Sequence, residues 1–484
     1  MGVIASCFAV TSATGYNIQN RWTTTATDGG GHSLGDPLTL LWSVAPDGTV
    51  WEGDGGNGSD VIEYLDDGWN VAALDRTADL TNRPWWDWMD RVYKQYSRVS
   101  GLTMEYVTDD GLPIGWGGAI GQRGDIRIGG RNIDSNIVGT LAHNAFPNNG
   151  EMTIDTFRDA QGIPSWWHSS FAPDQFRNLI AHESGHGTGL NHEILTGVDA
   201  VMEVPLESTF WALQFDEVYA LNRLYGDPLE KNGGNDFISS ATHLGVFGTD
   251  STVTLGADAG DAVVDEIDGD WLGIDGDSDS DWFRFSVTDT TWANITVAPL
   301  GPTYVSGQQG TFVASAQSDL NLQLFGPNGT NLLASIDQQG IGNTEVLERF
   351  ELTVAGEYFL HVGGESDLNQ FYQLDVLVTT FNGVEGDVNQ DGSVDEADIT
   401  AFQAGWLSDT SGMTLVESIM LGDLNASGRT DQEDVFILRE ALKANLANLD
   451  LDGLPADPVP EPSTLALCMV LSLLIFYRQQ MPTS

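Results

Sequence analysis

Residues 181–192 read AHESGHGTGLNH, and this stretch decides how the first half of the chain is interpreted. His182 and His186 are four residues apart, so on a helix both imidazoles lie on one face and can reach a single metal ion. Pro173 suits the first turn of such a helix, and apolar residues follow it at helical spacing. The sequence therefore predicts a helix that carries two metal ligands.

The residues after this pair predict a third ligand. Gly187 and Gly189 allow the helix to stop and the chain to turn back, which can bring His192 to the same ion. Three protein ligands leave a fourth position open for water, as in catalytic zinc sites, and Glu183 would lie beside it as the general base. The alternative is a pair of surface histidines with glycines nearby by chance, but chance rarely supplies this extended spacing.

The charge balance and the cysteine content restrict the function further. The chain of 484 residues carries 19 Lys and Arg against 70 Asp and Glu, a net charge of −51. This field repels phosphate backbones, so nucleic acid is not an expected partner. The acidity suits solubility or a salty habitat, or carboxylates that bind calcium. Cys7 and Cys468 stand near the two ends, so we expect neither a disulfide framework nor a thiolate zinc site.

From about residue 235 to residue 378 the helical periodicity gives way to alternation with a period of two. Short apolar-polar runs are separated by turns rich in Gly, Asn and Pro, which is typical of an all-β sandwich. The alternating apolar positions are Leu320, Leu322, Leu324, Phe350, Leu352, Val354, Tyr358, Leu360, Val362, Tyr372, Leu374, Val376 and Val378. Within this region the acidic run from Asp275 to Asp281 either binds calcium or forms a solvated loop.

Two twelve-residue segments, 387–398 and 423–434, share one register of oxygen-bearing side chains. Each has Gly at position 6 for a sharp turn and leads into a short amphipathic helix, the first through Ile399, Phe402 and Leu407. The expected calcium ligands are Asp387, Asn389, Asp391, Ser393, Asp395 and Asp398 in one loop, and Asp423, Asn425, Ser427, Arg429, Asp431 and Asp434 in the other. Ser393 and Arg429 would contribute backbone carbonyls. We expect two calcium ions, and the alternative is a pair of Asp- and Asn-rich turns.

The metal-binding stretch resembles the metzincin clan of zinc peptidases and, within it, the matrixins. Ala200-Val201-Met202 is similar to the Met-turn of that clan, which implies that Met202 lies beneath the zinc. Leu141 and Ala142 begin a stretch that resembles the edge strand along which matrixins bind substrate, and Pro205 begins the loop that shapes their S1′ pocket. The sequence departs from the matrixin pattern at Glu193, where matrixins usually have serine and astacins have glutamate.

The other segments also resemble known families. Asp281-Trp282-Phe283-Arg284-Phe285 is similar to the bacterial pre-peptidase C-terminal domain, which accompanies secreted peptidases. Asp at position 12 of both calcium loops resembles a type I dockerin, which implies a cohesin as a candidate partner. The sequence Val459-Pro460-Glu461-Pro462 with the apolar run 465–477 resembles a PEP-CTERM sorting signal, because a run of about 13 residues is short for a membrane span of about 20.

The expected fold is multidomain. It comprises a signal-peptide remnant at 1–14, an α+β metzincin catalytic domain at 15–228, an all-β sandwich at 229–382, a small α calcium-loop domain of dockerin type at 383–447, and a linker with a C-terminal apolar sorting helix at 448–484. The sorting tail implies transient association with a membrane, and a plain membrane anchor is the alternative.

The expected function is that of a secreted or cell-surface bacterial endopeptidase with one catalytic zinc, acting on protein substrates. A cohesin-like partner, or a cell-surface or exopolysaccharide partner, is also expected. One alternative is a non-catalytic matrix or adhesion protein that uses the same fold for binding, although an intact Glu183 argues against that role. Another is a scaffolded subunit whose calcium module serves assembly.

Overall fold

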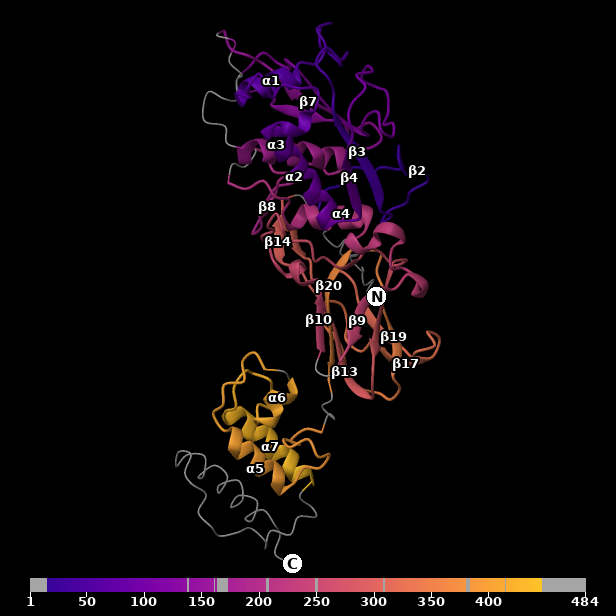
Figure 1. The fold of residues 1–484 in the computed structure, drawn as a ribbon, viewed down its shortest axis with the longest axis vertical. Helices are drawn as coiled ribbons and strands as arrows, with labels where there is room; N and C mark the ends of the chain where they lie inside the picture. The colour runs from indigo at the N-terminus through magenta and orange to yellow at the C-terminus, as the bar shows by residue number, and fades with distance from the viewer. Residues whose placement is uncertain are drawn as a thin grey trace, which may run out of the picture.

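The computed structural model describes residues 15–136, 139–160, 162, 173–205, 209–248, 251–307, 310–379, 384–413 and 415–445. The expected signal-peptide remnant at 1–14 and the sorting tail at 448–484 lie outside these ranges. Within them, no helix combines the length and the apolar character that crossing a membrane requires. Buried apolar residues in the described part of the chain form three clusters (Figure 1). The first fills the first body and extends to Trp271 and Phe371 of the second, and the other two lie in the second and third bodies. With the sheets of the first two bodies, this confirms a multidomain, β-rich chain.

The first body pairs a five-stranded sheet with helices. The strand order is β4-β3-β5-β7-β6, in which β6 alone runs antiparallel to its neighbour and forms one edge. The strands are β3 (Leu38–Val44), β4 (Leu102–Tyr106), β5 (Ile126–Arg131), β6 (Ala142–Asn144) and β7 (Glu151–Asp155), with short β1 (Thr24–Thr25), β2 (Gly29–Gly30) and β8 (Leu195–Thr196). The helices are α1 (Val61–Gly68), α2 (Pro84–Val99), α3 (Pro173–Thr188), α4 (Phe215–Tyr225) and the 3-10 turn η1 (Leu80–Asn82).

Local sequence explains the two long helices of this body. Both α2 and α3 begin with a proline, whose fixed φ suits the first helical turn. In α2, Trp85, Met89, Val92 and Tyr96 recur at helical spacing and are fully buried, so this face packs against the core. The two helices also pack against each other, which holds the expected metal-binding helix against the centre of the body.

The second body is a β-sandwich, as the alternation predicts. One sheet has β10 (Ser251–Leu255), β20 (Gln370–Thr379), β13 (Thr291–Pro299) and β18 (Glu345–Leu352), with β11 (Gly273–Ile274) also on β20; the other has β17 (Leu332–Ile336), β16 (Leu320–Phe325), β19 (Gly356–Gly364), β12 (Ser280–Val287) and β9 (Thr242–Phe247). The turns η3 (Pro228–Gly233), η4 (Ile238–Ser240) and η5 (Ala257–Gly260) accompany them. Alternate residues of β12 and β16 are buried, so each contributes one face to the core.

One residue and one hairpin depart from the expected alternation. Val354 lies between β18 and β19, and its side chain is 57% exposed because the chain turns there; its carbonyl accepts a hydrogen bond from the Tyr358 hydroxyl at 2.8 Å. The hairpin β14 (Thr303–Ser306) and β15 (Gly310–Val313) joins neither sheet and pairs instead with β8 of the first body.

The third body contains the helices α5 (Glu396–Gly405), α6 (Leu415–Met420) and α7 (Gln432–Asn445) around a small apolar cluster. The expectation that Leu407 belongs to the apolar face of the first helix is wrong. The helix ends at Gly405, where a side chain would collide with the carbonyl of Leu421, and Leu407 follows with φ +65° and its amide bonded to the Thr430 carbonyl. Its side chain is 48% exposed.

Candidate metal centres

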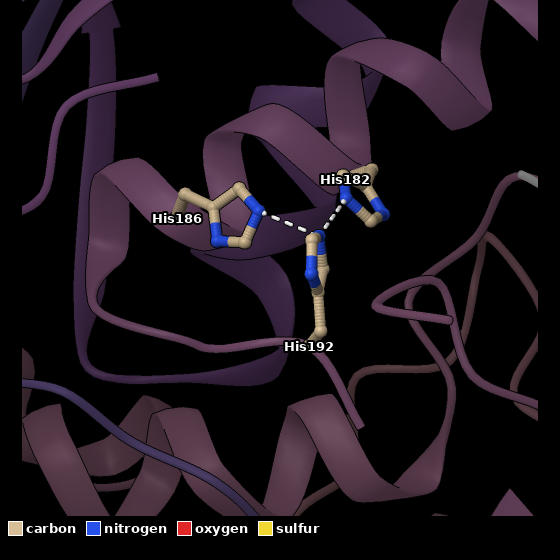
Figure 2. A group of neighbouring side chains, drawn as sticks. All are labelled: His182, His186 and His192. Carbon is tan, nitrogen blue, oxygen red and sulfur yellow. Dashed lines mark hydrogen bonds between the residues drawn. The ribbon is translucent and has the colours of Figure 1, made fainter. Parts of the chain in front are cut away.

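The three expected zinc ligands converge on one point. His182 and His186 project from the same face of α3, and His192 reaches them from the loop that follows the helix (Figure 2). The Nε2 atom of His192 lies 3.1 Å from the Nε2 of His182 and 3.1 Å from that of His186. Tetrahedral zinc with nitrogen ligands at about 2.0–2.1 Å separates those nitrogens by about 3.3 Å. The three side chains therefore fit a zinc ion without rearrangement.

Hydrogen bonds on the far side of two rings fix their tautomers. The Nδ1 of His182 lies 2.7 Å from the Val201 carbonyl, and the Nδ1 of His186 lies 2.8 Å from the Leu190 carbonyl. A carbonyl oxygen can only accept, so Nδ1 carries the proton in both rings and each Nε2 presents a lone pair. A single proton on the His192 Nε2 can serve one of these lone pairs at a time, whereas a cation serves all three. Burial lowers the pKa of His182 to about 4, which favours the neutral ligand form.

Close packing places Met202 against the turn of α3 between His182 and His186. Met202 is 2% exposed, and a Cβ atom at Gly185, between the two helical ligands, would collide with its sulfur. The backbone N–H of Met202 donates to the buried Glu217 carboxylate at 2.9 Å, and the same carboxylate accepts from the N–H of Gln214 at 2.9 Å. This capping box at the start of α4 therefore holds the Met202 turn in place.

The carboxyl group of Glu183 is buried next to the first ligand. It is 5% exposed, and its Oε2 has no hydrogen-bond partner among the described residues. Burial raises the pKa of Glu183 to about 8, although the backbone N–H of Asn144 donates to this carboxyl group and lowers it in part. Because Asn144 ends the edge strand β6, the carboxyl group of Glu183 lies between α3 and that strand. A buried carboxyl group with a free oxygen is suited to exchanging a proton with a bound water.

The expected substrate-binding residues lie at the edge strand β6 and shortly after Met202. Ala142 opens β6, and Leu141 precedes it with its carbonyl bonded to the Asp155 amide at 2.8 Å. Among the described residues the strand pairs only with β7, so its other edge is available for an added strand. Pro205 is exposed three residues after Met202, and residues 206–208 of the expected S1′ loop lie outside the described ranges.

The two calcium loops have the same internal hydrogen bonds. Asp387 accepts from the amides of Asp391 at 3.0 Å and Gly392 at 2.7 Å, at loop positions 5 and 6. Asp423 accepts from the amides at the same two positions of its loop, both at 3.0 Å. At position 12, Asp398 and Asp434 turn back into their loops and accept the amides of positions 3 and 9. The duplicated register that the sequence predicts is therefore present in the fold.

The carboxylates at positions 1 and 12 are enclosed as well as paired. Asp387, Asp398, Asp423 and Asp434 are each fully buried. Burial raises the pKa of Asp398 and of Asp434, and the neighbouring carboxylate at position 1 adds to the effect. The carboxylate at position 1 of each loop thus lies near the one at position 12, and calcium takes hard oxygen ligands of this kind.

Two of the predicted modules match known families. Residues 279–364 match the model of the bacterial pre-peptidase C-terminal domain, and residues 385–443 match that of the dockerin type I domain. Both resemblances are thereby confirmed. Dockerin type I domains bind calcium and cohesin partners, and both families are typical of secreted or extracellular bacterial proteins. Comparison with curated proteins finds no match.

Similar solved structures add little to these family matches. The pre-peptidase C-terminal domain of a collagenase from Bacillus anthracis is 16% identical, and the match covers 28% of this chain and 95% of that one with a TM-score of 0.17. A β-glucosidase from Paenibacillus barengoltzii is 17% identical, and the match covers 30% of this chain and 12% of that one with a TM-score of 0.16.

Calcium removal is expected to destabilise the dockerin domain. Saturation with calcium at about 100 times Kd would stabilise it by about 2.7 kcal/mol, because the ion binds only the folded loops. Calorimetric titration of the zinc-loaded chain checks the sites: Asp387→Ala and Asp423→Ala should each lower the calcium stoichiometry by one. Asp289→Ala, which removes an exposed carboxylate of the β-sandwich, is the control. An unchanged stoichiometry in either loop variant would contradict the assignment.

The acidic run 275–281 is only partly solvated, which corrects one of its two expected descriptions. Asp277 is exposed, but Asp281 is fully buried and bonds Asn235 and Tyr372. Carboxylate oxygens of Glu230, Asp236 and Asp279 lie within 4.8 Å of one another beside it. Burial raises the pKa of Asp279 to about 6 and, with nearby Asp227 and Asp281, that of Glu230 to about 12.

The buried carboxyl groups around Asp279, which include Asp275 and Asp227, predict that the thermal stability of the chain in metal-free buffer depends on pH. Burial raises the folded-state pKa of Asp275 to about 8 and of Asp227 to about 7, above their unfolded values. The stability that their protonation contributes is therefore fully present below the unfolded pKa of about 4, and it is lost as pH rises from there through the folded values of about 7 and 8. Thermal unfolding should show a midpoint on the order of 5 °C lower at pH 8 than at pH 5. Asp279→Asn should reduce this slope and the exposed Asp277→Asn should not; an equal slope in both variants would contradict the prediction.

Proposed function

We propose that this chain is a secreted zinc endopeptidase of matrixin type, with His182, His186 and His192 as the ligands and Glu183 as the general base. The observation that carries the proposal is the convergence of three Nε2 atoms, two of them with Nδ1 protons committed to backbone carbonyls. The five-stranded sheet with one antiparallel edge strand and the packing of Met202 against Gly185 support the same proposal.

The chain's own residues account for the binding and the proton transfers of peptide hydrolysis. An extended substrate pairs with the free edge of β6, which brings its scissile bond beside Glu183. Zinc, when bound, supplies Lewis acidity for the attacking water and for the carbonyl oxygen. The Glu183 carboxylate takes a proton from that water and returns it to the leaving amine. The Nδ1 hydrogen bonds to Val201 and Leu190 keep the ligand rings oriented throughout.

Export is part of the proposal. The confirmed pre-peptidase C-terminal and dockerin modules support a location outside the cell. The PEP-CTERM resemblance of the tail, which lies outside the described residues, adds sorting toward an exopolysaccharide-rich exterior. Hydrolysis of extracellular proteins is the role that fits a zinc peptidase with these neighbours.

Cleavage of an unfolded protein tests the proposal. The purified chain, loaded with zinc and calcium, is incubated with casein, and the fragments are separated and sequenced from their N-termini. We expect fragments with new internal N-termini, which would establish endopeptidase activity. Intact casein in the presence of stoichiometric zinc, repeated with several unfolded substrates, would instead favour a binding role for the fold.

The dockerin match favours a second role, assembly on a cohesin-bearing partner. This role is compatible with catalysis, since the calcium loops belong to a body with its own apolar core. Retention of the chain on an immobilised type I cohesin with calcium, and its release by a chelator, would support it. Equal retention by the chain and by Asp387→Ala/Asp423→Ala would contradict it.

A further inference from the structure

The β14–β15 hairpin lies between strands of the β-sandwich in sequence but packs on the first body. Its apolar side chains Tyr304 and Phe312 are 2% and 1% exposed and belong to the buried cluster of the first body. The hairpin pairs with β8, the short strand that begins three residues after His192 (Figure 1). A segment of the pre-peptidase C-terminal domain region thus completes the body that holds the zinc ligands.

The hairpin contacts every residue from 193 to 196. The Ser306 hydroxyl donates to the Glu193 carboxylate at 2.6 Å, and the Gly307 amide donates to the Ile194 carbonyl at 2.7 Å. Leu195 and Thr196 then pair with β14 in the three-stranded sheet. Ser306 and Glu193 are each 1% exposed, so their hydrogen bond is shielded from water. The chain that follows the third ligand is therefore fixed along its length.

The same hairpin is anchored to the helix that supports Met202. The Tyr304 hydroxyl donates to the buried Asp216 carboxylate at 2.6 Å, and the Tyr304 ring packs edge-on against Phe215. Both partners lie in the first turn of α4, next to Glu217, which holds the Met202 amide. The position of the hairpin is thus tied to the framework beneath the metal site.

His192 needs such support more than the other two ligands. Helix α3 orients His182 and His186, whereas His192 is an exposed residue in a loop after the helix has ended. On its N-terminal side the loop is held by Asn17, whose carbonyl accepts from the Asn191 amide at 2.8 Å, and the Asn17 side chain also donates to the His192 carbonyl at 3.1 Å. On its C-terminal side the described contacts include the Met202 carbonyl, which accepts from the Glu193 amide, and the hairpin. Preorganised outer contacts of this kind commonly change metal affinity by about 10–100-fold.

We propose that the β14–β15 hairpin positions the third zinc ligand, with Ser306 as the positioning residue that acts through Glu193. This inference rests on the proposed zinc site and extends it. A segment of the β-sandwich region contributes to the geometry of the metal centre, so the sandwich is more than a separate attached domain. We therefore expect the first body to bind zinc at full affinity only when it is joined to the sandwich and the β14–β15 hairpin is docked on it.

Zinc affinity of the full-length chain tests the proposal without relying on peptidase activity. Zinc is titrated against a competing chelator in the parent and in Ser306→Ala, and the visible absorption of the cobalt-loaded proteins reports the ligand geometry. We expect Ser306→Ala to bind zinc about 10–100-fold more weakly and to show an altered cobalt spectrum. Ser306→Thr, which retains the hydroxyl, should restore both values.

A matched control separates positioning from general destabilisation. The Ser366 hydroxyl also donates a hydrogen bond, to the Gln317 carbonyl at 2.7 Å, but within the sandwich. Ser366→Ala should therefore leave zinc affinity and the cobalt spectrum unchanged. If Ser306→Ala binds zinc as tightly as the parent, the positioning inference is wrong and the proposed function is unaffected. If the parent binds no zinc, both this inference and the proposed function are wrong. If the parent binds zinc but cleaves no protein, the proposed activity is contradicted, and the zinc affinities of the variants still test the positioning role.

Discussion

The Glu183→Gln variant is expected to lose about 10²–10⁴-fold in kcat/KM for casein while keeping its zinc. The amide has nearly the shape of the carboxylate, so the buried position should still pack, but it cannot take a proton from water. The Glu183 carboxylate also has an oxygen with no hydrogen-bond partner among the described residues, so its replacement breaks few structural contacts. Steady-state cleavage of a fluorescent casein, with zinc content measured on the same samples, checks the prediction.

Glu63→Gln is the control for this variant, because Glu63 is an exposed residue of α1 in the same body. It should retain parental kcat/KM. Parental activity in Glu183→Gln, with zinc bound, would show that another group performs the proton transfer. Loss of activity together with loss of zinc would assign Glu183 a role in metal binding instead.

The second large effect is expected from His192→Ala, which should weaken zinc binding by more than about 100-fold and abolish proteolysis. The variant removes one of three ligands and leaves the Nε2 atoms of His182 and His186 without the third donor that now lies 3.1 Å from each. Because His192 is exposed and outside the helix, the fold should persist, and the unfolding midpoint of the metal-free variant should match that of the metal-free parent.

Competition with a chelator measures this affinity, with His243→Ala as the control. His243 is an exposed residue of β9 in the sandwich and contributes to no metal group among the described residues. Its removal should leave zinc affinity unchanged. Parental zinc affinity in His192→Ala would reduce the site to two histidines and contradict a catalytic centre with three ligands.

Local patterns predicted much of the fold because they act within a few residues. Proline at the first turn and apolar residues at helical spacing predicted the helix that carries His182 and His186, which is α3 at Pro173–Thr188, and alternation predicted β16 and β20 with their buried faces. The same reasoning went wrong at Leu407, because the close approach of Gly405 to the Leu421 carbonyl ends the helix, and that contact joins α5 to a different element. Spacing alone cannot show such a contact.

The support of the metal site was beyond prediction for the same reason. The spacing of residues 182–192 predicted the ligand set, which the fold brings together. The carbonyl of Val201, which fixes the His182 tautomer, and Ser306, which bonds Glu193 across 113 positions of sequence, have no local signal. A backbone carbonyl is present at every residue, so the sequence does not show which one bonds His182. A serine in an alternating strand likewise does not show whether its hairpin is docked on another body.

Stepwise zinc addition to the chelator-stripped chain, with casein cleavage followed at each step, tests the catalytic zinc site. We expect no cleavage without metal and a linear rise that reaches its plateau at one zinc per chain. The Glu183→Gln chain should bind the same one equivalent and stay inactive. Cleavage that persists in the stripped chain, or a chain that binds no zinc, would contradict the assignment of His182, His186 and His192 as a catalytic zinc site.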